Sequence, residues 1–277
     1  MLAGQHEKKS NELHPFQENV IKVLTGMIPY ESTSFLNDRS TPSGRKISSE
    51  ILWGFFDELG LESQSHDYTS SHPMIFPDLF FGPARGTNIY AILESNPKND
   101  YVVIGAHYDA EPGSPGAGDN ASGVALVASL AKILKAHDAL PFNYIFVFFD
   151  QEEDNELGSK AFAEFIEEKE WGIHSVHVTD LAGWDKDGDG AVIIQTSNKY
   201  MKEIYLKASK KLQVEIRITS GGSSDNKSFQ RVFPTVGVFG DITKHLHKPT
   251  DTYETVDFEF LTLMTRLMSE VLVTLDK

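Results

Sequence analysis

The sequence contains no cysteine among its 277 residues. This absence excludes disulfide bonds, zinc–thiolate sites, iron–sulfur clusters and catalysis by a thiol. Any metal ion must therefore be bound by histidine and carboxylate side chains. The sequence also lacks any run of 18 apolar residues free of charge, so no transmembrane segment is predicted.

Positive charge is scarce relative to negative charge. The chain has 25 Lys and Arg residues against 40 Asp and Glu residues, which gives a formal net charge of −15 at pH 7. Such a surface repels phosphate backbones, so nucleic acid is not an expected partner. Some of the excess carboxylates are available as metal ligands, and bound cations would offset part of the charge.

The N-terminal segment shows no secretory signal. Met1 to Leu13 is polar and lacks the apolar core of a signal peptide. A mature form from which a signal had been removed would look the same, so the expectation is a soluble protein of unknown compartment, with export left open. Residues 1–14 are predicted to form the loose end of a single domain that spans residues 1–277.

From residue 88 onward, short apolar segments alternate with amphipathic ones. Residues 102–104 and 145–149 are apolar throughout, which predicts strands buried on both faces by helices. The fold expected is α/β, a three-layer α/β/α sandwich with a mixed, mostly parallel central sheet. Residues 70–86 contain three prolines and two glycines and are predicted as a loop. Strands are predicted at 88–93, 101–106, 144–149, 175–179, 191–196, 214–218 and 235–239. Helices are predicted at 16–24, 44–59, 121–136, 158–168, 199–211, 224–231 and about 258–275.

Polar residues with catalytic or metal-binding chemistry lie just beyond the ends of these strands. In a sheet covered by helices, ligands bind beyond the carboxyl ends of the strands. We therefore expect these side chains to converge on one edge, although they are spread over about 140 residues of sequence. The candidates are His107, Asp109, Asp119, Glu152, Glu153, Asp180, His245 and His247.

Imidazole and carboxylate ligands without thiolate suit zinc or a similar divalent ion. One catalytic zinc takes about three protein ligands and a water, so five candidates are too many for one open site. They fit two ions if one carboxylate bridges them, and Asp119 is the best bridge because its glycine-flanked loop allows a close approach. Glu152, next to a ligand, is free to act as general base toward a metal-bound water. The five candidate ligands are His107, Asp119, Glu153, Asp180 and His247.

Five motifs, in this order along the chain, resemble those of a known enzyme family. They are G-A-H-Y-D at 105–109, G-A-G-D-N-A-S-G at 116–123, F-F-D-Q-E-E…E-L-G-S-K-A-F at 148–162, T-D-L-A-G at 179–183 and H-K-P-T-D-T at 247–252. Together they resemble the zinc aminopeptidase family of the bacterial leucyl aminopeptidase type. Its superfamily also contains glutamate carboxypeptidases and glutaminyl cyclases. The resemblance covers about residues 85–277, where the catalytic motifs are expected.

The resemblance implies two Zn²⁺ ions and a role for each motif residue. One zinc would be held by His107 and Asp180, the other by Glu153 and His247, with Asp119 bridging them. Glu152 would be the general base and would later protonate the leaving amine. Asp109 would hold the far ring nitrogen of His107, and Asp251 would support the loop of His247.

The activity expected is that of a di-zinc metallo-aminopeptidase that hydrolyses N-terminal residues from peptides, with a metal-bridging hydroxide as nucleophile. Peptides are the expected partners, and the oligomeric state is left open. No large insertion interrupts the motifs, which favours a compact open pocket, and an apolar wall is predicted near Phe229, Phe233 and Phe239.

One departure from the family's motifs is visible at Asn226, where relatives often carry histidine. We expect it to alter the surroundings of the metals rather than the ligands.

Other functions stay open on this scaffold. A glutaminyl cyclase would form pyroglutamate from N-terminal glutamine, but those enzymes usually carry Trp before the last histidine ligand and Asp-Asp after it. Here Leu246 precedes the histidine and Asp251-Thr252 follows it, which favours a peptidase. A carboxypeptidase is a further alternative. A non-catalytic binding module is least favoured, because all five ligands and Glu152 are present.

Several candidate residues have a simpler structural alternative. His245 competes with His247, and the H-x-x-x-D-T spacing favours His247. Asp119 is also a candidate helix N-cap. Glu152 and Glu153 would otherwise form a solvated acidic face, which is disfavoured directly after an apolar strand. The remaining histidines without supporting partners, His137, His174 and His177, are predicted to be structural.

The segment Asp185-Lys186-Asp187-Gly188-Asp189-Gly190 resembles the start of a calcium-binding loop. The twelfth position of such a loop would be Thr196 in place of the usual glutamate. A polar turn between two strands is therefore the favoured interpretation, and calcium at Asp185, Asp187 and Asp189 is the alternative.

Overall fold

The computed structural model describes residues 2–31, 36, 38–70, 84–96, 98 and 100–276, with side chains described from residue 13 onward. The helices are α1 (Leu2–Leu24), α2 (Pro42–Glu58), α4 (Ser122–Lys135), α5 (Leu157–Glu168), α6 (Lys199–Leu212), α7 (Asn226–Phe229) and α8 (Phe258–Val273). The strands are β1 (Ser63–Ser70), β2 (Ala84–Leu93), β3 (Tyr101–His107), β4 (Asn143–Phe149), β5 (Ile173–Asp180), β6 (Val192–Gln195), β7 (Ile216–Thr219) and β8 (Thr235–Phe239). Two further short helical segments are η1 (Ala117–Ala121) and η2 (Tyr253–Thr255).

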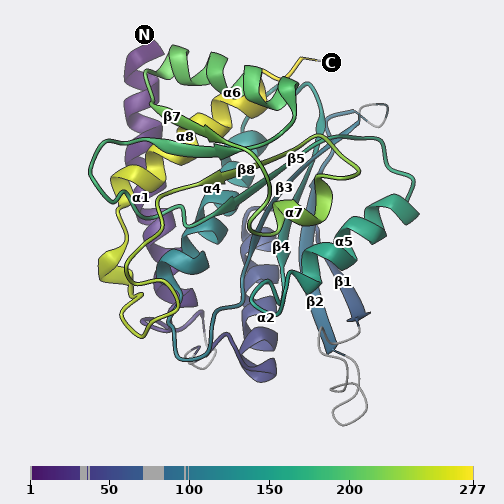
Figure 1. Ribbon diagram of the computed structural model, residues 1–277, viewed down its shortest axis with the longest axis vertical. Coiled ribbons are helices and arrows are strands. Elements are labelled where there is room, and N and C mark those ends of the chain that lie inside the picture. The colour runs from purple at the N-terminus through teal and green to yellow at the C-terminus, as the bar shows by residue number, and fades with distance from the viewer. Residues whose placement is uncertain are drawn as a thin grey trace.

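The described strands form one mixed sheet in the order β1-β2-β4-β3-β5-β8-β6-β7 (Figure 1). Strands β4, β3, β5 and β8 run parallel to one another in its centre. Antiparallel pairing occurs between β1 and β2, between β2 and β4, and between β6 and β8, while β6 and β7 are parallel. The fold class predicted from the sequence, a three-layer sandwich around a mixed sheet, is confirmed.

Side chains of the central strands are buried alternately in two hydrophobic layers. Val102 and Ile104 of β3 pack with residues of α1, α2, α4, α6 and α8, whereas Val103 packs on the opposite face with residues of α5 and α7. This burial on both faces explains why β3 and β4 are largely apolar, whereas β5 also carries buried polar side chains such as His177. No helix in the described part of the chain combines the length and hydrophobicity that crossing a bilayer requires.

The sequence interpretation missed β1 and misplaced the start of α1. Strand β1 lies at the sheet edge, and its sequence is mostly polar because only some of its side chains face the core. Residues 2–14, predicted to be a loose end, continue α1 to Leu2. Most of this segment consists of residues with high helix propensity, so the helix extends beyond its apolar stretch. The predicted loop at 70–86 lies largely outside the described residues.

His177 illustrates a polar group fixed inside the core. It lies on β5 with no exposed surface, and its ring nitrogens contact the hydroxyl groups of Ser175 and Tyr205 at 3.1 and 2.9 Å. Burial lowers the pKa of His177 to about 3. The side chain is therefore neutral in the folded protein, in keeping with a structural role.

The stability of the protein should fall in mild acid because of His177. The pKa of His177 is lower in the folded chain than the ordinary value of about 6.5. The neutral side chain therefore stabilises the folded state fully above about pH 6.5, and this stabilisation is lost as the pH falls toward 3. Between pH 7 and pH 5, the free energy of unfolding of the wild type should drop by about 2 kcal/mol more than that of His177→Leu. Urea titrations measure this difference. The exposed-site control His137→Asn should retain the wild-type pH dependence, and equal pH dependence in His177→Leu would refute the assignment.

Candidate metal centre

The candidate residues meet at the carboxyl edge of the central parallel strands. His107 is the last residue of β3 and Asp180 the last of β5, while Glu152 and Glu153 follow the end of β4. Strands β4, β3 and β5 are neighbours and run in the same direction. Their ends therefore place residues from distant parts of the chain side by side.

A first group of ligand atoms surrounds the ring of His107. Its Nε2 lies 3.2 Å from Oδ1 of Asp119 and 3.6 Å from Oδ1 of Asp180. All three residues are buried, and their ligand atoms lie within 4.8 Å of one another. This spacing suits three ligands of one divalent ion.

A second group of ligand atoms surrounds His247. Its Nε2 lies 3.1 Å from Oδ2 of Asp119 and 3.2 Å from Oε2 of Glu153. Asp119 therefore presents one carboxylate oxygen to each of the two histidines. The competing candidate His245 faces elsewhere, since its Nδ1 contacts Oγ1 of Thr250 at 2.9 Å.

Asp119 stands on the turn η1, which is held from two sides. The carboxylate of Asp251 accepts hydrogen bonds from the backbone N–H groups of Gly118 and Asp119, at 2.9 and 3.0 Å. On the other side, the guanidinium of Arg39 donates to the carbonyl of Gly116 at 2.6 Å. Gly116 has a φ of 65°, and a side chain there would meet the Arg39 guanidinium. Glycine is thus required at this position by both conformation and space.

The helix-cap alternative for Asp119 is not what the structure shows. Helix α4 begins after Ala121 without a side-chain cap at that residue. Oδ1 of Asn120 accepts a hydrogen bond from the backbone N–H of Gly123 at 2.9 Å instead. Asn120 therefore takes the helix-capping role, and the Asp119 carboxylate points into the ligand groups.

Asp109 links the first group to the loop after β4. Its Oδ1 lies 3.3 Å from Nδ1 of His107, the ring nitrogen opposite the ligand atom. The same carboxylate accepts the backbone N–H groups of Glu152 and Glu153, at 3.0 and 3.2 Å. One buried side chain thus orients the imidazole and positions both glutamates.

The pKa values of the site residues are shifted because several largely buried carboxylates lie close together and beside two histidines. Burial would raise the pKa of Asp119, but close contacts with His107 and His247 lower it well below its usual range. Contact with Asp119 raises the pKa of His247 to about 9. Burial raises the pKa of Glu153 to about 8 and that of Glu152 to about 9. Concentrated negative charge of this kind is attractive to cations.

Buried polar atoms without hydrogen bonds support a metal-binding role. Carboxylate oxygens lie 3.2–3.6 Å from the two ring nitrogens of His107, but no described residue completes a well-aligned hydrogen bond to either nitrogen or to Oε1 of Glu153, and these atoms have no access to water. Such orphaned atoms are costly unless another partner satisfies them. With nitrogen and oxygen donors only, the residues present fit divalent cations of the zinc type.

Three residues beside the loops of the site adopt a left-handed backbone conformation. Gln151, Leu181 and His247 have φ values of 57°, 52° and 56°. For residues with a side chain this conformation costs about 1–2 kcal/mol. The surrounding structure therefore holds the loops that carry Glu152, Asp180 and His247 against their local preference.

Three charged residues near the site were not predicted from the sequence. Arg39 is buried, and the carboxylates facing it include Asp251 and Asp109. Asp225 has no exposed surface and lies near Glu152, whose pKa it helps to raise. Asp225 directly precedes Asn226, the position where the sequence departs from its relatives. Glu111 follows the first motif and lies beside His247.

Phe229 belongs to the core rather than to a pocket wall. It has no exposed surface and packs against Phe149 with ring centroids 5.7 Å apart. Phe233 packs against the same hydrophobic layer. The aromatic pocket wall predicted from the sequence is therefore wrong for Phe229.

The acidic segment 185–190 is organised around protein partners. The two oxygens of Asp185 accept backbone N–H groups of Gly188 and Gly190 at 3.0 and 2.8 Å. Arg217 forms ion pairs with Asp189 and with two further aspartates of this region, Asp187 and Asp241. A guanidinium already supplies the positive charge, which favours the polar turn over a calcium site.

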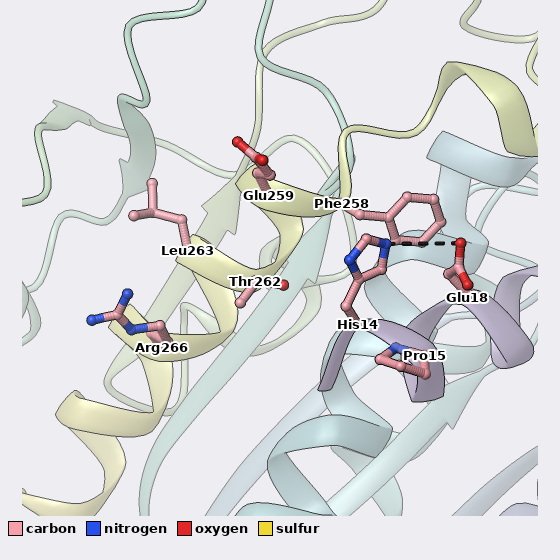
Figure 2. A pocket seen from close by; sticks show the side chains of 8 residues that line it. All are labelled: His14, Pro15, Glu18, Phe258, Glu259, Thr262, Leu263 and Arg266. Atoms are coloured by element: carbon pink, nitrogen blue, oxygen red, sulfur yellow. Dashed lines mark ion pairs between the residues drawn. The ribbon is translucent and has the colours of Figure 1, made fainter. Parts of the chain in front are cut away.

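A groove of about 500 Å³ lies between α1 and α8 (Figure 2). His14 stacks on Phe258 with ring centroids 4.9 Å apart and pairs with Glu18 at 3.8 Å. None of the lining residues is among the candidate ligands. The groove is therefore a separate feature from the candidate metal centre.

Comparison with known proteins identifies the family. The sequence profile of peptidase family M28 matches residues 88–272, which is about two thirds of the chain. The chain belongs to peptidase family M28. Within this family, it is 31% identical over 181 residues to aminopeptidase YwaD of Bacillus subtilis, covering 60% of this chain. The chain spans only 40% of the length of that relative.

Solved structures show how widely the M28 fold is shared. The zinc aminopeptidase BSAP from Bacillus subtilis superposes with a TM-score of 0.79 at 16% identity, covering 93% of this chain and 94% of that one. A glutaminyl cyclase from Fimbriiglobus ruber superposes with a TM-score of 0.76 at 17% identity, covering 95% of each chain. The family prediction made from the motifs is confirmed, while the fold by itself does not separate the two activities.

Proposed function

We propose that this member of family M28 is a zinc-dependent aminopeptidase with two metal ions. The observation that carries the proposal is the placement of Asp119, whose two oxygens lie 3.2 and 3.1 Å from the ring nitrogens of His107 and His247. This is the arrangement expected of a carboxylate that bridges two cations. His107 and Asp180 would hold one ion, and Glu153 and His247 the other.

Zinc bound by such ligands lowers the pKa of water to about 7 and polarises a carbonyl group. The remaining steps fall to residues of the chain. Asp109 fixes the ring of His107 through Nδ1, so that Nε2 faces Asp119 and Asp180. The same residue fixes the backbone of Glu152 and so sets where its carboxylate can act.

Glu152 is proposed as the general base. It adjoins a proposed ligand but contributes to none of the described ligand groups, so its carboxylate is free to move a proton. Burial raises its pKa to about 9, and added positive charge nearby would favour the carboxylate form. Glu152 would accept a proton from the attacking water and deliver it to the nitrogen of the departing peptide.

Aminopeptidase activity is favoured over the alternatives by relatives and by sequence. One matching curated relative is named an aminopeptidase, and Leu246 occupies the position where glutaminyl cyclases usually carry Trp. Glutaminyl cyclase remains the second candidate because one such enzyme shares the fold. The products separate the activities: a free N-terminal amino acid, a pyroglutamyl peptide without cleavage, or a free C-terminal amino acid from a carboxypeptidase.

Removal of metal should abolish the activity reversibly. We expect a chelator to eliminate release of the chromophore from aminoacyl-p-nitroanilides, because the water and the carbonyl group lose their activation. Adding back zinc should restore the rate, with full recovery near two equivalents per chain. An activity that survives complete removal of metal, verified by elemental analysis, would disprove the proposal.

A further inference from the structure

Glu111 lies in the second ligand group although it belongs to none of the five motifs. Three ligand atoms lie within 4.8 Å of one another here: one carboxylate oxygen of Glu111, one carboxylate oxygen of Glu153 and one ring nitrogen of His247. We propose that Glu111 is an additional protein ligand of the ion held by His247 and Glu153. This inference rests on the proposed two-ion function and extends it.

The backbone around Glu111 is tied to the loop that carries the bridging aspartate. The carbonyl of Glu111 accepts a hydrogen bond from the N–H of Ser114 at 3.0 Å, and the hydroxyl of Ser114 accepts one from the N–H of Gly116 at 3.2 Å. Arg39 donates to the carbonyls of Pro115 and Gly116 in the same stretch. Glu111 and Asp119 therefore stand at opposite ends of one braced loop.

The carboxylate of Glu111 has no competing partner in the described part of the chain. No hydrogen bond or ion pair there engages it, unlike Glu156, which pairs with Lys160 and Lys227 at 2.9 Å. Oε1 of Glu153, in the same group, is buried without a hydrogen bond. A cation would satisfy both glutamates at once.

The extra ligand makes the two metal positions unequal. The position at His107 has two residues besides the bridge, all buried, whereas the position at His247 has three besides the bridge and is half-exposed. A third carboxylate adds negative charge where the site opens to solvent. We expect it to compensate for that exposure and to tighten binding of the second ion.

Zinc titration of metal-free protein tests this role. Wild type and Glu111→Gln are titrated with Zn²⁺ against a chromophoric chelator, with thermal unfolding measured to confirm folding. The wild type should bind two equivalents. In Glu111→Gln one equivalent should keep its affinity within about twofold, and the other should weaken at least tenfold, since even indirect partners of metal ligands contribute about 10–100-fold. Glu254→Gln removes one exposed negative charge outside the ligand groups and should match the wild type.

The outcomes separate this inference from the proposed function. Two equivalents of wild-type affinity in Glu111→Gln would overturn the ligand role of Glu111 and leave the two-ion centre intact. A raised KM for peptide with unchanged zinc affinities would overturn it too, because it would assign Glu111 to the substrate amine. A wild-type chain that binds fewer than two equivalents would overturn both the two-ion function and this inference.

Discussion

Replacing Glu152 with glutamine is expected to lower kcat by about 10²–10⁴-fold while zinc content stays at the wild-type level. The amide keeps the size of the side chain but cannot accept the proton of the attacking water. Glu152 lies outside both described ligand groups, and its backbone N–H is fixed by Asp109, so the ligand geometry should survive. Steady-state kinetics together with elemental analysis of the same sample measure both quantities.

The control for this variant is Asp154→Asn. Asp154 is an exposed carboxylate two residues further along the same loop, where it accepts a hydrogen bond from Gln151. Removing its charge tests whether any acidic residue of the loop affects kcat, and we expect a change of about twofold or less. Full turnover in Glu152→Gln would exclude Glu152 from proton transfer and would require another base.

Replacing Asp119 with asparagine should remove metal binding more severely than loss of any other ligand. An amide offers one oxygen and an N–H₂ group that repels cations, so it cannot bridge both proposed ions. We expect zinc content to fall below one equivalent per chain and activity to drop at least 100-fold, since even partners outside the ligand set contribute about 10–100-fold. Isothermal titration with zinc and elemental analysis measure the loss.

Asp180→Asn provides the comparison for the bridging role. Asp180 contacts the first group only, so its replacement should weaken one equivalent of zinc and spare the other. If Asp119→Asn and Asp180→Asn lose the same single equivalent, then Asp119 is an ordinary ligand of one ion. The two-ion proposal would then lack its central observation.

The central strands and the residues after them were predictable for one physical reason. Parallel strands covered by helices on both sides are rich in apolar residues, so polar residues with ligand chemistry stand out at or just beyond their ends. His107, Glu153 and Asp180 occupy such positions, and the carboxyl ends of neighbouring parallel strands coincide in space. Strand pattern alone thus brought together residues more than 70 positions apart.

The apolar pattern of the strands does not reveal which side chains from distant segments contact the site. Strand β1 is an edge strand with a polar face, so it carries no continuous apolar signal. Arg39 comes from the connection between α1 and α2, and no periodicity or motif links it to residues 115 and 116. Glu111 depends on the path of one loop. Positions of this kind are fixed by tertiary packing and are invisible to local sequence.

The contact of Arg39 with the Asp119 loop also bears on how much of the chain the candidate metal centre needs. Every proposed ligand falls between residues 107 and 247, inside the stretch shared with the family. Yet the guanidinium that braces the Asp119 loop originates nearly 50 residues before that stretch begins. A fragment trimmed to the shared region would keep every proposed metal ligand but would lose the hydrogen bonds that Arg39 donates to the Asp119 loop. The amino-terminal third thus helps to set the geometry of the candidate metal centre.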